Sequence, residues 1–151
     1  MDGVTATTTE LNYTDGVTSA IQTQLDSKVG VSGNTFTGTT TVSGKAIFGA
    51  EIVEEVFSIP SSTTPELDPA DGTVQEWTLT GNSTPTDVFA TGEYITLMVD
   101  DGSGYTITWT AVDEWIGGST PTLDTTETTV IEIWKVGAVV YGALVGVASS
   151  A

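Results

Sequence analysis

From residue 46 onward the chain repeatedly alternates apolar and polar residues, and short polar segments separate the alternating runs. The run 74–80, VQEWTLT, shows this alternation cleanly. Successive side chains of a β-strand point to opposite faces of a sheet, so a period of two predicts strands with one buried and one exposed face. The pattern therefore restricts this part of the chain to a mainly β structure.

Turn residues between the runs predict how the strands are connected. The runs 92–99 and 105–110 flank the sequence DDGSG. This cluster predicts a β-hairpin, because Asp and Gly adopt the unusual backbone angles of tight turns. Gly137 separates the runs 129–136 and 138–145, which predicts either a second hairpin or a bend with a bulge.

With a further run at 46–59 that breaks near Gly49, about seven strands are expected. The 30 threonines of the chain agree with this, because a β-branched side chain favours a pleated, half-exposed surface. We predict an antiparallel β-sandwich with a jelly-roll-like arrangement. Its four tryptophans are expected to dominate the core or an interface: Trp77, Trp109, Trp115 and Trp134.

Residues 1–30 carry a different pattern. A Thr-Ser pair can cap a short helix there, and Val17, Ile21 and Leu25 then form one narrow apolar stripe at i, i+4 and i+8. A helix of about ten residues with such a stripe is marginal in water and needs a packing partner. We predict that the same stripe in neighbouring copies of the chain is this partner. The alternative is a lone helix that packs on its own β-domain.

Residues 31–45 join the two parts. They are rich in Gly, Thr and Ser, and Phe36 and Val42 are their only sizeable apolar residues after Val31. This composition predicts an extended linker or loosely paired strands. The expected organisation is an attachment and trimerisation segment at 1–30, a linker at 31–45 and a β-sandwich domain at 46–151.

The charge of the chain restricts its partners. Its formal net charge is −17, from 20 acidic residues and three lysines. Nucleic acid and anionic lipid are not expected partners, because phosphate groups are bound by cationic surfaces. A basic partner surface or a divalent cation suits the charge better. The N-terminus lacks a signal-peptide pattern, and the apolar run 136–147 is too short to span a bilayer, so no membrane insertion is expected.

Catalysis is not expected from the residue types present. The chain has no His and no Cys, so its many Ser and Thr hydroxyls lack an evident base. Three pairs of adjacent carboxylates can in principle supply the acid and base of a glycosidase: Glu54–Glu55, Asp100–Asp101 and Asp113–Glu114. Adjacent residues of a strand point to opposite faces, so such pairs do not converge. We expect a protein that is not an enzyme and needs no cofactor.

The turn at Asp100 and Asp101 is a candidate binding loop. Its oxygen donors suggest calcium, but the spacing and the terminal Glu of an EF-hand are missing, so a plain hairpin turn is favoured. Tyr105 and Trp115 lie beside acidic loops, where exposed aromatic rings can stack on sugars. These four residues are the candidate surface-binding residues. Burial of the tryptophan in the core is the alternative.

Two segments of the chain resemble proteins of tailed bacteriophages. Residues 9–28, TELNYTDGVTSAIQTQLDSK, resemble a connector motif of fibre and other appendage proteins, where a segment like Thr-Phe-Thr-Gly-Thr at 35–39 often follows. Residues 95–146, with Trp-Ile-Gly-Gly and Glu-Ile-Trp-Lys-Val, are similar to terminal β-domains of such fibres. The first resemblance is the more specific of the two.

The resemblance implies a homotrimeric structural protein of a virion, assembled in the host cytoplasm. Because the chain is short beside many relatives, a short tail fibre, a fibre fragment and a head fibre or capsid decoration protein are all compatible with it. Its expected partners are copies of itself and other virion proteins. In the alternative, the β-domain is a tip that binds a host receptor or glycan during adsorption. A polysaccharide depolymerase is disfavoured because solenoid repeats are missing.

Overall fold

The computed structural model describes residues 3, 5–12, 17, 20, 21, 23, 40–100 and 104–149. The chain divides into two compact units, Met1–Phe48 and Gly49–Ala151. The predicted boundaries at residues 30 and 45 stay predictions. Residues 40–55 are exposed and contain neither helix nor strand, so the strand expected at 46–59 is reduced to its last part.

The first unit contains the short helix α1 (Thr8–Asn12), which was not predicted. A capping box begins it. The Thr7 hydroxyl accepts a hydrogen bond from the Glu10 amide at 3.3 Å, and Glu10 Oε2 accepts one from the Thr7 amide at 2.8 Å. The bond from this amide is the main reason why the pKa of Glu10 is lowered. The Thr-x-x-Glu spacing is the sequence signal that identifies this helix start.

Part of the predicted trimerisation stripe lies outside the described residues. Val17 and Ile21 are described, and they are 37% and 60% exposed. Leu25 is not among the described residues, nor are residues 31–39 of the predicted linker. Trimerisation through this stripe therefore stays a prediction.

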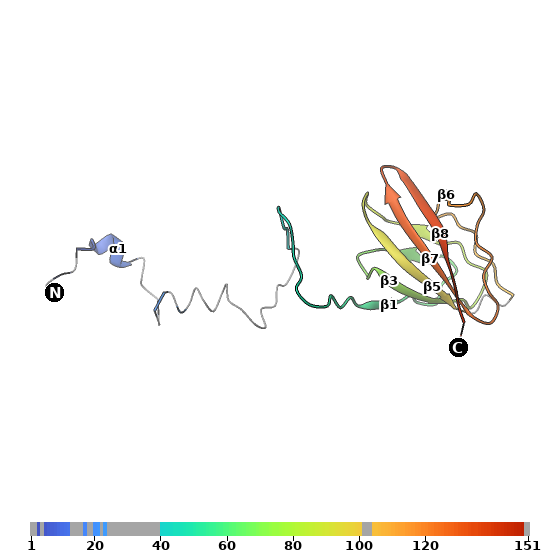
Figure 1. The fold of residues 1–151 in the computed structure, drawn as a ribbon, viewed down its shortest axis with the longest axis horizontal. Coiled ribbons are helices and arrows are strands. Elements are labelled where there is room, and N and C mark those ends of the chain that lie inside the picture. Colours follow the sequence, from blue (N-terminus) through green and yellow to red (C-terminus); the bar gives the residue numbers. More distant parts are fainter. Residues whose placement is uncertain are drawn as a thin grey trace. The chain divides into compact units, whose positions relative to one another are not determined.

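The second unit is mainly β, as predicted. Six of its strands form one main sheet in the order β1-β3-β5-β7-β8-β6, and β2 and β4 form a second, two-stranded sheet. Figure 1 shows β1, β3, β5, β7 and β8 side by side. The strand bounds are β1 (Val56–Ser58), β2 (Glu66–Leu67), β3 (Val74–Thr78), β4 (Thr86–Asp87), β5 (Tyr94–Asp100), β6 (Glu114–Trp115), β7 (Thr128–Val136) and β8 (Val139–Ala148).

The main sheet is mixed, which corrects the expectation of a purely antiparallel sandwich. β1, β3 and β5 are parallel neighbours, and so are β6 and β8. Only the pairs β5–β7 and β7–β8 are antiparallel. Parallel neighbours need long crossover connections, and these are the segments 59–73 and 79–93, which contain β2 and β4. A jelly-roll arrangement is not confirmed.

Of the two alternatives predicted at Gly137, a second hairpin or a bend with a bulge, the structure shows the hairpin. β7 and β8 pair from Val136–Val139 to Thr128–Ala148, with one register shift at Val130/Ile131. Gly137 has a φ of 62°, in the left-handed region that glycine adopts without strain. A turn between strands that are adjacent in sequence needs only local information, so the sequence pattern suffices to predict it.

The hairpin predicted between 92–99 and 105–110 is wrong. β5 pairs with β3 and β7 instead. The segment around Ile107 forms an isolated bridge to Ser83, whose amide donates to the Thr106 carbonyl at 2.9 Å. The alternation identified both segments as extended, but burial of β5 between β3 and β7 decided its partners.

The hydrophobic core lies on one face of the main sheet, which we call the inner face. Ile95 and Leu97 of β5 and Ile131 and Ile133 of β7 have no exposed surface. Their register places Ile95 opposite Ile133 and Leu97 opposite Ile131. Leu67 of β2 belongs to the same core cluster, so the two-stranded sheet contributes to the cover of this face. Each such side chain contributes about 1.5–3 kcal/mol on burial.

A buried glutamine ties a crossover connection to the inner face. Gln75 of β3 has no exposed surface. Its Nε2 donates to the carbonyls of Asp68 at 2.7 Å and Gly72 at 2.9 Å. A buried amide that is paired in this way fixes the loop before β3 against the sheet.

Candidate functional site

The opposite face of the main sheet, which we call the outer face, carries a row of three aromatic side chains. Tyr94 of β5 pairs in register with Trp134 of β7, and Trp134 pairs with Tyr141 of β8. Directly opposite residues of antiparallel strands point to the same face, so the three side chains are neighbours across three strands. The rings of Trp134 and Tyr141 stack, with centroids 5.9 Å apart and planes 18° apart. Tyr94 is 45% exposed.

Carboxylates and a thioether occupy the next rows of the outer face. Glu132, which is exposed, lies two residues before Trp134 and pairs with Thr96. Met98 pairs with Val130 on one side and with the exposed Glu76 on the other. Same-face residues along a strand are about 6.6 Å apart, so acidic groups follow the aromatic row at short intervals.

A hollow of about 150 Å³ lies at the end of the outer face away from the aromatic row. Its lining residues are Glu76, Thr78, Met98, Asp100 and Thr128. Two carboxylates thus flank a methionine side chain that is itself half-buried. This arrangement offers negative charge beside one apolar side chain, that of Met98.

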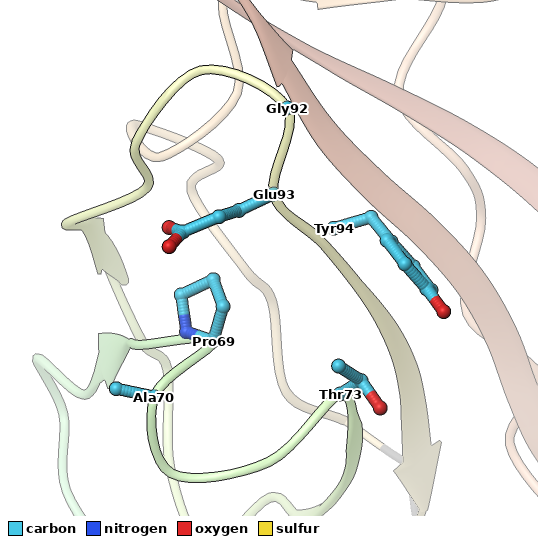
Figure 2. A pocket seen from close by; sticks show the side chains of 6 residues that line it. All are labelled: Pro69, Ala70, Thr73, Gly92, Glu93 and Tyr94. Atoms are coloured by element: carbon cyan, nitrogen blue, oxygen red, sulfur yellow. The ribbon is translucent and has the colours of Figure 1, made fainter. Parts of the chain in front are cut away.

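A second pocket, of about 280 Å³, lies at the Tyr94 end of the aromatic row, and Figure 2 shows the side chains that line it. The Glu93 carboxylate lies close to the Pro69 ring, while the Tyr94 side chain points away from that carboxylate. Glu93 Oε2 accepts a hydrogen bond from the Ala90 amide at 2.7 Å. This carboxylate therefore has a local structural partner.

Charge is distributed unevenly in the second unit. Residues 49–151 include sixteen acidic residues but one basic residue, Lys135. Its Nζ lies 3.3 Å from Asp87 Oδ2 of β4, so Lys135 shares the inner face with the core. In the strands that the structure describes, the outer face carries Glu76, Asp100, Glu114 and Glu132 and no basic side chain.

The predicted surface-binding residues are not gathered in one place. Asp100 ends β5 and is exposed, while Asp101 lies outside the described residues. Trp115 of β6 is separated from β5 by β7 and β8 in the sheet order. It is half-buried, packs against the core and meets Trp109 edge to face, with ring centroids 5.2 Å apart.

Tyr105, the fourth predicted surface residue, is 37% exposed. It lines a hollow of about 220 Å³ whose other lining residues include Trp109, Pro121 and Leu123. None of the residues that line this hollow belongs to the outer face. The role of all four predicted residues in surface binding stays a prediction.

Two of the six carboxylates considered for catalysis have structural partners. Asp113 Oδ2 accepts a hydrogen bond from the Val140 amide at 2.8 Å, and the Asp113 amide donates to the Val140 carbonyl at 2.8 Å. Asp113 thereby extends the pairing of β8. The Glu54 carboxylate accepts a hydrogen bond from the Thr73 hydroxyl. Within the described part of the chain, no acidic group of three or more is arranged to hold a metal ion.

One acidic loop residue has a perturbed pKa. Asp124 Oδ1 accepts hydrogen bonds from the amides of Thr126 at 2.8 Å and Glu127 at 2.9 Å. These bonds stabilise the carboxylate and lower the pKa of Asp124, with the Thr126 amide as the largest cause. The arrangement is a tight turn that leads into β7, and it explains the local structure without a ligand.

Comparisons of the chain with protein-family models, curated proteins and solved structures find no match. In the described residues, no helix is long and apolar enough to cross a membrane. The outer-face row of Tyr94, Trp134 and Tyr141 was not predicted as a site. Alternation in VIEIWKV (130–136) shows that Trp134 faces away from the neighbouring isoleucines, but it does not show which face is covered.

Proposed function

We propose that the protein is a structural component of a tailed-phage virion: a homotrimeric short fibre, or a head fibre or capsid decoration protein. It attaches through its N-terminal region and presents the β unit. The observation that carries this proposal is the segment 9–28, which resembles the connector of phage appendage proteins. The mainly β second unit is of the kind that such proteins end in.

The physical properties of the two units support this proposal. The second unit has its own core, in which Leu97 and Ile133 are completely buried. It therefore does not need the stripe of the first unit for stability. Val17 and Ile21 expose their apolar side chains in the single chain. Trimerisation would remove this surface from water, which stabilises the assembly by about 25 cal/mol per Å².

The decisive variant carries Ile21→Asp with Leu25→Asp in the full chain. We expect a mixture shifted from trimer to monomer in light scattering, because a carboxylate in an apolar contact loses its hydration without compensation. Circular dichroism of the β unit is expected to stay unchanged. Particles produced with the variant are expected to contain less of the protein, as measured by mass spectrometry.

A matched control places the same charges on the other side of the expected helix, as Ser19→Asp with Thr23→Asp. This control should leave the trimer intact. A wild-type monomer at micromolar concentration, together with the absence of the chain from purified particles, would refute the proposal. Loss of the β signal in the first variant would instead place the stripe in the core of the second unit.

A second candidate function is binding of a host glycan or receptor by the β unit. The observation in its favour is the hollow that contains Tyr105 and Trp109, since sugar rings stack on exposed aromatic side chains. Tyr105→Ala should abolish the signal on a glycan array. An array that the wild-type chain does not bind would remove this candidate and leave the structural role untouched.

A further inference from the structure

We infer that the outer face of the main sheet binds a lysine- and arginine-rich segment of a partner protein, through Trp134 and the carboxylates of Glu76, Asp100 and Glu132. This inference concerns the β unit alone. It does not require the attachment, trimerisation or virion role of the N-terminal region.

The aromatic row supplies one half of the recognition. Tyr94, Trp134 and Tyr141 lie side by side, and Tyr94 keeps 45% of its surface exposed. The face of an aromatic ring attracts a cation, and Trp attracts it most strongly. Arginine also stacks its planar guanidinium on such rings. Glu132, two residues before Trp134 on the same face, supplies the opposite charge for a cation held there.

The hollow around Met98 supplies the other half. Glu76 and Asp100 line it, and both are exposed at its rim. Trp134 and Val130 are four residues apart on β7, and Val130 is paired with Met98. The aromatic row and the hollow are therefore about 13 Å apart along the strands. An extended segment with cations at positions i and i+4 has the same spacing.

Charge complementarity identifies the occupant. A second copy of this chain has one basic residue in residues 49–151, and that lysine is paired with Asp87 on the inner face. Self-association through the outer face would therefore bring carboxylates together without cations. Nucleic acid is repelled by the same carboxylates. A neutral ligand would use the rings but would leave the three carboxylates without a counter-charge.

The test measures binding of a labelled peptide by fluorescence anisotropy. In the peptide, arginine recurs at every fourth position of a Gly-Ser background. The protein is the full chain, either wild type or with Glu76→Gln, Asp100→Asn and Glu132→Gln together. A matched control, Glu51→Gln with Glu66→Gln and Asp71→Asn, makes the same change in net charge at exposed positions away from the outer face.

We expect the outer-face variant to lower the affinity for the peptide about tenfold at low salt, since each exposed ion pair contributes a part of that factor. The control should change it less than about twofold. Salt should weaken wild-type binding, because exposed charges are screened. Equal losses in the two variants, or no binding by the wild type at low salt, would overturn the inference.

A separate variant tests the aromatic half without a change in charge. Trp134→Ser should lower the affinity for the peptide about threefold, as loss of one exposed cation–π contact implies. Thermal unfolding by circular dichroism shows whether the variant is folded. If Trp134→Ser lowers the unfolding temperature so far that the variant is no longer folded, Tyr94→Ser tests the same aromatic row at a more exposed position.

Two other occupants give results that would also overturn the inference. Binding of neutral oligosaccharides that is lost in Trp134→Ser but unaffected by salt and by the outer-face variant would identify a glycan surface. A fall in the mass measured by light scattering for the outer-face variant, relative to the control, would identify a contact between copies. Either failure leaves the virion proposal open, because that proposal is tested by the stripe variants.

Discussion

The two faces of the main sheet differ although they belong to the same strands. In β5, Leu97 is completely buried on the inner face, while its neighbour Met98 is half-buried on the outer face. The inner face buries many aliphatic side chains together with Trp77 and Gln75, and the crossover connections contribute to its cover. The outer face mixes aromatic rings with carboxylates. The comparison shows that stability is concentrated on one face, which leaves the other free to be shaped by binding.

The largest expected effect comes from adjacent residues on the two faces. Leu97→Ala should lower the free energy of unfolding by about 2–5 kcal/mol, because it removes buried methyl groups and leaves a cavity. Met98→Ala should lower the free energy of unfolding by about 1 kcal/mol, as is typical of a partly exposed position. Denaturant unfolding followed by circular dichroism measures both. Similar costs at the two positions would show that the outer face is covered in solution.

A smaller effect is expected where β6 approaches β8. A Cβ at Gly142 would lie 2.6 Å from the Trp115 ring, closer than real contacts allow. Gly142→Ala should therefore lower the free energy of unfolding by about 1–3 kcal/mol and shift the tryptophan fluorescence, because the ring must move.

Ala143→Ser provides the matched control for this prediction, since Ala143 pairs with Glu132 of the outer face. It should change the free energy of unfolding by less than about 0.5 kcal/mol. If Gly142→Ala leaves the free energy of unfolding unchanged, Trp115 does not pack on β8. That result would remove the contrast between the two faces at this edge of the sheet.

The mainly β character and one hairpin followed from local patterns. Alternation in VQEWTLT predicted β3, and Gly137 between two apolar runs predicted the turn from β7 to β8. The helix at Thr8–Asn12 has a local signal as well, the Thr-x-x-Glu spacing, although it was not predicted. These features depend on residues that are near each other in the chain.

The pairing of β5 could not be predicted in the same way. The cluster DDGSG favoured a hairpin between β5 and 105–110, yet β5 is flanked by β3 and β7. Alternation identifies a strand and its two faces, but it contains no information about which distant strand will lie beside it. Packing of Leu97 against Ile131, more than thirty residues away, decides that choice.

The candidate surfaces depend on the same distinction. The sequence by itself determined the excess of carboxylates, the lack of His and Cys, the period-two strands and the resemblance of residues 9–28 to a phage connector. Only the tertiary structure decided that Trp115 packs inward while Tyr94, Trp134 and Tyr141 line up on one uncovered face of the described sheet. The physical reason is that an alternating strand has two faces, and contacts between distant segments choose which one is buried.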